Sequence, residues 1–152
     1  MPDWYWQYHD KLIADINIEN ACEYALMHDC GKPYCRTIDN DGKQHFPNHA
    51  EISYQTYLKI SDNRAIADLI KHDMDIHILK ADGIEQFCQN KNAALHLLAG
   101  LAEINSNAEH SGGFDTINFK IKFKTLSQRG KAICNFLFKG DAHGNKEEHY
   151  GS

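Results

Sequence analysis

The sequence predicts an all-α fold, and three observations support this prediction. Apolar residues recur at helical spacing in several segments, and glycine, proline or asparagine residues separate these segments. The last apolar segment is also too long for an ordinary strand. The chain has 152 residues, of which 42% are hydrophobic and 24% charged, with 10 glycines and 3 prolines, which is the composition of one folded domain. We expect a compact bundle of about six or seven helices with a hairpin-like insertion, formed by residues 1–140, and a polar tail at 141–152.

Turn residues mark the ends of the expected helices. A Gly-Lys-Pro sequence at 31–33 ends the first of them. Asn48 is expected to cap a later helix, with His49 in its first turn. The Ser-Gly-Gly sequence at 111–113 ends the clearest one. The helices expected from these signals span 18–28, 49–60, 64–72 and 90–110.

Residues 116–138 carry two competing periodicities. Polar residues alternate with Ile117, Phe119, Ile121 and Phe123, as they would in a strand. A longer apolar stripe recurs at steps of four and three, which is typical of the core-facing side of a helix, and we therefore predict a helix. The stripe consists of Phe119, Phe123, Leu126, Gly130, Ile133 and Leu137.

A surface hairpin or a long loop is expected between Tyr34 and Phe46. The turn pair Asp41-Gly42 lies there between two short extended runs. An insertion of this kind can shape the mouth of a substrate site.

Composition limits the functional classes. The formal net charge is −5, from 16 basic and 21 acidic residues, which argues against a general affinity for nucleic-acid backbones or anionic membranes. The sequence has no apolar run of membrane-spanning length, and its first residues do not resemble a secretory signal, so we expect a cytoplasmic protein without membrane contact. Its 5 cysteines form no CxxC pair, whereas its 10 histidines are many, and several lie beside carboxylates.

The adjacent residues His28 and Asp29 are the strongest candidates for a functional site. Neighbouring side chains on a regular helix diverge by about 100°, so both can reach one ion only where the helix ends at once. The sequence from Cys30 to Pro33, CGKP, supplies that break. Imidazole nitrogen and carboxylate oxygen together suit first-row divalent metals without selecting one of them.

The motif HDCGKP, followed by RT, DNDG, HF and NHAEIS, resembles the HD superfamily of metal-dependent phosphohydrolases. The resemblance covers roughly residues 9–110 and is greatest to the HD domain attached to bacterial tRNA nucleotidyltransferases and to its stand-alone relatives. It implies an HD-type helical bundle that hydrolyses a phosphomonoester or phosphodiester with metal-activated water. The implied partner is a small phosphate ester or nucleotide, or the end of an RNA.

The same resemblance implies roles for individual residues. One or two divalent ions are expected, from among manganese, iron, cobalt, nickel, magnesium and zinc. Asp29 would act in catalysis as a ligand that two metals share, Lys32 would bind the substrate and stabilise phosphoryl charge, and Arg36 would bind a second phosphate or the nucleotide. The family has a late aspartate where this sequence has Glu103, and Asp82 is a weaker candidate. The implied metal ligands are His9, His28, Asp29, His49, His72 and Glu103.

Two other functions fit parts of the same sequence. Proteins with a similar six-ligand pattern bind two irons and use oxygen to cleave carbon–phosphorus or carbon–carbon bonds, and such an oxygenase is the first alternative. The second is a non-catalytic module that binds a nucleotide or nucleic acid, because basic residues are interleaved with Phe119 and Phe123. These basic residues are Lys120, Lys122, Lys124, Arg129 and Lys131.

Overall fold

The computed structural model describes residues 1–110 and 112–139, so the tail expected at 141–152 lies outside the described residues. Within them the predicted all-α fold is confirmed, with seven helices of five residues or more and one two-stranded sheet. None of these helices combines the length and the apolar character needed to cross a membrane. The elements are α1 (Asp3–Ile13), α2 (Ile18–Met27), α3 (Lys32–Cys35), β1 (Thr37–Ile38), β2 (Gln44–His45), α4 (His49–Tyr57), α5 (Arg64–Lys71), α6 (Asp75–Ile78), the 3₁₀ helix η1 (Ala81–Gly83), α7 (Ile84–Cys88), α8 (Ala93–His110) and α9 (Ile117–Phe138).

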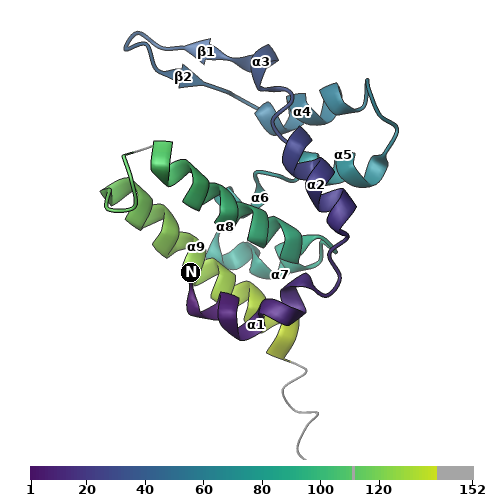
Figure 1. Cartoon of the computed structure of the whole chain (residues 1–152), viewed down its shortest axis with the longest axis vertical. Coiled ribbons are helices and arrows are strands. Elements are labelled where there is room, and N and C mark those ends of the chain that lie inside the picture. Colours follow the sequence, from purple (N-terminus) through teal and green to yellow (C-terminus); the bar gives the residue numbers. More distant parts are fainter. Residues whose placement is uncertain (111, 140–152) are drawn as a thin grey trace, which may run out of the picture.

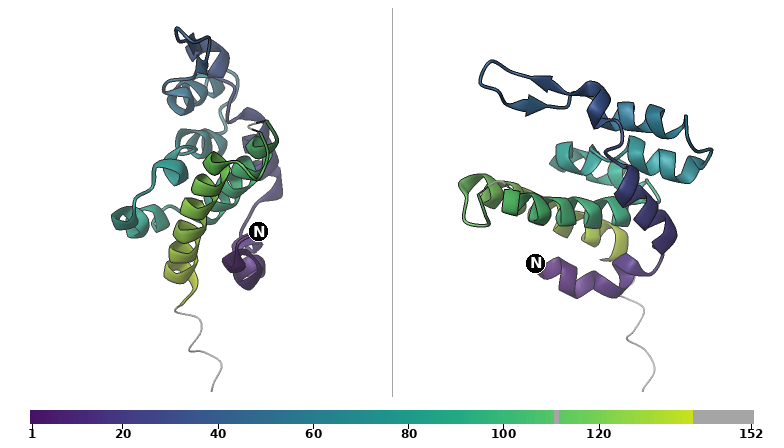
Figure 2. Two further views of the ribbon diagram at one scale, coloured as in Figure 1. Left: turned by 90° about the vertical axis from the view of Figure 1, so that its left-hand side faces the viewer. Right: turned by 45° about the horizontal axis from the view of Figure 1, so that its top comes forward.

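The helices form two packed groups (Figures 1 and 2). The long helices α8 and α9 lie side by side, and α1 and α7 pack against α9. At the other end of the molecule α4 packs on α5, α5 on α2, and α3 on α4, with the hairpin projecting beyond them. Each group has its own apolar cluster, the first around Leu97, Leu101 and Ile133 and the second around Ile66 and Ile70.

The sequence predicts α9 correctly. Thr116 caps it, because its Oγ1 accepts a hydrogen bond from Phe119 N at 3.3 Å. Leu126, Gly130 and Ile133 of the predicted stripe are buried. Ile117 and Ile121, which belong to the strand-like alternation, are exposed. Burial along α9 therefore follows the helical period and not the alternation.

The predicted hairpin is confirmed, and two helix boundaries differ from their predictions by three residues. β1 and β2 pair antiparallel, with Gly42 at a φ of 78° in the turn between them. Helix α4 ends at Tyr57 rather than at residue 60, because the amides of 59 and 60 bond back in a tight turn that leads into α5. Helix α8 begins at Ala93 rather than at residue 90, since the side chain of Asn90 holds a turn by accepting from Asn92 N at 2.8 Å.

Gly31 allows α3 to approach α4 closely. A Cβ atom at this position would lie 2.3 Å from Ser53 N and 2.7 Å from Ser53 Cα. Gly31 N also donates a hydrogen bond to Ser53 Oγ at 2.9 Å. Its φ of −87° is open to any residue, so space and not backbone conformation requires glycine here. The contact fixes the segment 28–32 against α4, and with it the position of the His28-Asp29 pair.

We predict that Gly31→Ala lowers the free energy of unfolding by about 1–3 kcal/mol, because backbone atoms of Ser53 cannot move aside as a flexible side chain would. Urea denaturation followed by circular dichroism measures this loss. Gly83→Ala is the matched control, since the nearest atom to its added Cβ is Leu79 Cδ1 at 3.2 Å, the end of a flexible side chain. Equal losses in the two variants would contradict the prediction.

Candidate metal centre

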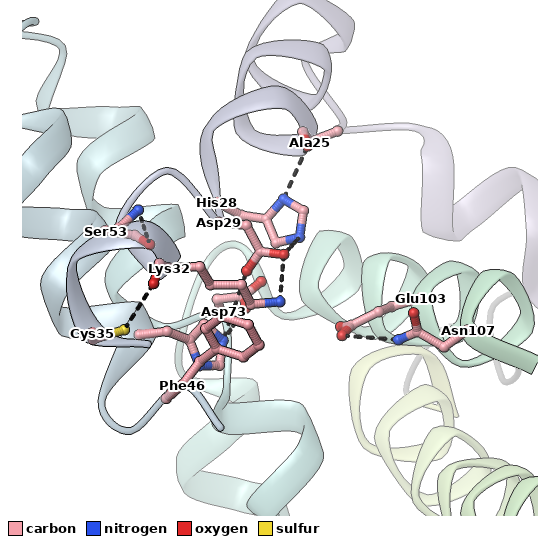
Figure 3. Close-up of polar contacts among 12 residues, drawn as sticks. Ala25, His28, Asp29, Lys32, Cys35, Phe46, Ser53, Asp73, Glu103 and Asn107 are labelled. Carbon is pink, nitrogen blue, oxygen red and sulfur yellow. Dashed lines mark hydrogen bonds and ion pairs between the residues drawn. The ribbon is translucent and has the colours of Figure 1, made fainter. Parts of the chain in front are cut away.

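His28 and Asp29 lie where α2 ends. His28 is the last residue of the helical path, and its ring Nδ1 is 2.9 Å from Ala25 O. Because a carbonyl oxygen only accepts, Nδ1 donates this hydrogen bond, and Nε2 is the ring nitrogen left to face another group. This Nε2 lies 3.4 Å from Asp29 Oδ2 (Figure 3). The helix end therefore turns both side chains toward one point, as the sequence predicts.

His49 faces the same carboxylate from the start of α4. Asn48 before it adopts a left-handed φ of 54°, and its side chain makes no capping bond, so it turns the chain without the expected side-chain cap. The His49 Nδ1 atom donates to Phe46 O at 3.2 Å, which directs Nε2 to within 3.8 Å of Asp29 Oδ1. That oxygen is buried and has no hydrogen-bond partner among the described residues. A buried carboxylate oxygen of this kind is costly unless a cation meets it.

Asp73 completes the group, although it is not among the site residues that the sequence predicts. It follows α5, is 5% exposed, and its Oδ2 lies 3.9 Å from His49 Nε2. The Tyr24 hydroxyl donates to the other oxygen, Oδ1, and burial, followed by the nearby Asp73 charge, raises the pKa of Tyr24. A signal for Asp73 is present in the sequence: His72-Asp73 is a second His-Asp pair directly after a helix, as His28-Asp29 is.

Lys32 closes one side of the group. Its Nζ donates to Asp29 Oδ2 at 2.6 Å and lies 5.5 Å from the centre of the Phe46 ring (Figure 3). The cation is thus held beside the candidate ligands, where the sequence analysis expects a phosphate-binding lysine.

Three other expected residues are not brought to this group. His9 lies on α1 at the far end of the molecule, where its ring contacts Asp10 and Tyr5. His72 turns away from the site: its Nδ1 pairs with Asp75 Oδ2 at 2.7 Å, and its Nε2 faces Asp68 at 3.7 Å. Arg36 is exposed where α3 ends and makes no contact with the His28-Asp29 pair.

Glu103 lies near the group but has another partner. Its Oε2 is 2.8 Å from Nε2 of His77, a residue to which the sequence analysis assigned no role. The hydrogen bond between them, together with the charge of the partner, raises the pKa of His77 and lowers that of Glu103, and burial acts against both shifts. Glu103 is therefore engaged in an ion pair beside the site, rather than free to serve as the last metal ligand.

Four donor atoms fit a divalent ion by their chemistry. Each belongs to a side chain whose other polar atom is already held: by Ala25 O, by Lys32, by Phe46 O and by the Tyr24 hydroxyl. Such outer contacts commonly fix the orientation of metal ligands. Atoms that bind one ion at roughly 2.0–2.2 Å lie about 3–4 Å apart, which matches the distances from His49 Nε2 to Asp29 Oδ1, 3.8 Å, and to Asp73 Oδ2, 3.9 Å. The His28 Nε2 atom lies 3.4 Å from the other oxygen of Asp29, Oδ2. The donors are His28 Nε2, Asp29 Oδ1, His49 Nε2 and Asp73 Oδ2.

Pairs of these donor atoms have separations that suit one ion, but the donors together do not yet surround a single position. In residues 1–110 and 112–139, no three His, Cys, Asp or Glu side chains already surround a position for an ion. A bound ion would therefore draw these donors closer together. The buried oxygen of Asp29 without a hydrogen-bond partner is the feature that favours such an ion most directly.

Two pockets open on either side of the group. One has a volume of about 360 Å³ and lies between α8, α9 and the His49 side of the site. The other, of about 580 Å³, lies between α2 and α8 on the Asp29 and Asp73 side. Lys32, Glu103 and Asn107 line both pockets, so a ligand can reach the candidate centre from either.

Comparison with models of known families finds no match, and comparisons with curated proteins and with solved structures find no similar protein. The HD-type resemblance thus rests on the motif residues of this sequence, and the candidate metal centre rests on the geometry described above.

We predict that the His77–Glu103 pair stabilises the fold most between about pH 5 and 6.5. The raised pKa of His77 gives stability that is complete below its unfolded value of 6.5 and is lost as the pH rises through the folded value. The lowered pKa of Glu103 gives stability that is complete above 4.5 and is lost as the pH falls through the folded value.

Glu103→Gln should accordingly lower the free energy of unfolding by about 1 kcal/mol near pH 6 and by less above pH 8. The cost is small because the side chain is 37% exposed and solvent screens the ion pair. Denaturation curves at several pH values measure this difference. Glu109→Gln, an exposed change on the same helix, is the control. A cost independent of pH would show that the ion pair is not its source.

Proposed function

We propose that the chain is a metal-dependent phosphohydrolase whose centre is formed by His28, Asp29, His49 and Asp73. The buried oxygen of Asp29 without a hydrogen-bond partner, facing His49 Nε2 at 3.8 Å, carries the proposal. Two imidazoles and two carboxylates are a donor set that first-row divalent ions accept. A nucleotide or an RNA end as substrate and a cytoplasmic location are parts of this proposal that come from the sequence.

The reaction is the addition of water to a phosphate ester: the oxygen of water bonds to phosphorus, the P–O bond to the alcohol breaks, and the alcohol leaves with a proton. A divalent ion, when bound, lowers the pKa of water and polarises the phosphoryl group. The imidazoles of His28 and His49 would hold it through Nε2, and Asp29 and Asp73 through one oxygen each. Tyr24 keeps Asp73 in place by its hydrogen bond to Oδ1.

Lys32 has a separate role in this proposal. Its ammonium group lies beside Asp29 and lines both pockets, so it can bind a phosphoryl oxygen of a substrate that enters from either side. Negative charge grows on these oxygens in the transition state, and a fixed cation there lowers the barrier.

The oxygenase alternative receives less support. Its six-ligand pattern includes His9 and His72, and these rings contact Asp10 and Asp75 instead of the proposed donors. A centre with four donors favours hydrolysis over chemistry that needs two irons.

We predict that Asp73→Asn lowers the metal content of the purified protein. Its hydrolysis of p-nitrophenyl phosphate should fall about 100-fold or more. Asp29→Asn and His49→Ala should do the same. Elemental analysis gives the metal per chain, and circular dichroism confirms that each variant folds.

His72→Gln and His9→Gln are the controls, because their side chains contact Asp75 and Asp10 and not the proposed donors. Both should retain metal and activity. Loss of metal in His72→Gln with retention in Asp73→Asn would return the ligand role to His72 and refute the proposed donor set.

We also predict that Lys32→Ala retains its metal but loses about 100- to 1,000-fold in kcat, since it removes a charge that acts on the transition state rather than a ligand. Lys43→Ala, in the exposed hairpin, should leave kcat unchanged. Metal loss in Lys32→Ala would instead assign the lysine to keeping Asp29 in place.

A further inference from the structure

The pocket of about 360 Å³, which we call the α9 pocket, has more positive charge than its own residues neutralise. It is lined by Lys32, Glu103, His77, Lys122 and Arg129, among other residues. Lys32 pairs with Asp29 at 2.6 Å, and Glu103 with His77 at 2.8 Å.

Lys122 and Arg129 are the other two cationic side chains that line the α9 pocket. Neither forms an ion pair with a carboxylate within the part of the chain that the structure describes, whereas Lys120 on the same helix pairs with Asp115 at 3.5 Å. In a chain of net charge −5, two unpaired cations on the wall of one pocket mark a site for an anion.

The spacing on α9 places these groups on one face. Asn118, Lys122, Thr125 and Arg129 follow at steps of four, three and four, which form a single stripe along a helix, and all four line the pocket. The amide and the hydroxyl add hydrogen-bonding groups between the two charges. Lys124 and Lys131, although also seven residues apart, do not line this pocket. The basic strip expected from the sequence is therefore divided between different faces of α9.

His49 and Lys32 also line the α9 pocket, so the pocket is continuous with the candidate centre. A volume of about 360 Å³ lies within the roughly 300–1,000 Å³ of small-molecule sites. We propose that the α9 pocket binds a second phosphate of the substrate, through Lys122 and Arg129, while the reacting phosphate lies at the centre. The inference rests on the proposed function and narrows its substrate class to esters with two separate phosphate groups, such as nucleoside bisphosphates.

Titration calorimetry with two probes tests this inference. Adenosine 3′,5′-bisphosphate and adenosine 5′-monophosphate differ by one phosphate, and we expect the full chain to bind the bisphosphate at least about tenfold tighter, the factor that one charge-assisted hydrogen bond supplies. In the double variant Lys122→Ala/Arg129→Ala this preference should disappear, and it should weaken with added salt in the wild type.

The control is Lys124→Ala/Lys131→Ala, which removes the same charge at the same spacing from the same helix and should keep the preference. No preference in the wild type, or an equal loss in both double variants, overturns the inference. Binding is measured apart from turnover, so the two proposals can fail separately. A preference for the bisphosphate without any hydrolysis would support the phosphate site in the α9 pocket and refute the phosphohydrolase. Hydrolysis without a preference for the bisphosphate would support the phosphohydrolase and refute the phosphate site.

Discussion

The ion pair from Lys32 Nζ to Asp29 Oδ2 at 2.6 Å occupies one oxygen of a carboxylate whose other oxygen is buried without a hydrogen bond. The rest of the site is arranged around this asymmetry. The close contact of Gly31 with Ser53 fixes the turn that carries both residues, and it brings the start of α4, with His49, to the unpaired oxygen. A buried carboxylate oxygen without a partner costs free energy, and a cation at this oxygen would offset that cost.

The site is built from two similar helix ends, each followed by a His-Asp pair, but only the first directs both members of its pair at the centre. After α2, His28 and Asp29 both face the centre. After α5, Asp73 faces it, while His72 pairs with Asp75 on the outside. The Tyr24 hydroxyl explains part of this difference, because α2 packs on α5 and holds Asp73 inward from a position 49 residues earlier. A buried carboxylate with one fixed oxygen is thereby directed at His49.

What the sequence predicts well is local. The helical stripe of α9, the Asp41-Gly42 turn and the helix break after Asp29 each depend on residues within a few positions, and the structure has all three. Asp73 could not be found in this way, since its orientation depends on a tyrosine distant in the chain. Glu103 fits a motif position, yet its partner His77 comes from α6, and only the packing of α6 on α8 brings the two together.

The charged side chains around the centre differ in whether they have an ion-pair partner among the described residues. Glu103, which lines the same pockets as Lys32, pairs with His77, whereas Lys32 pairs with Asp29. Lys122 and Arg129 remain unpaired across the pocket. Cations that are not neutralised by the protein attract an anionic ligand most strongly, because binding breaks no existing ion pair. By the same reasoning, a net charge of −5 does not exclude the polyanionic substrate that we propose, because the field inside one pocket is set by the few groups that line it.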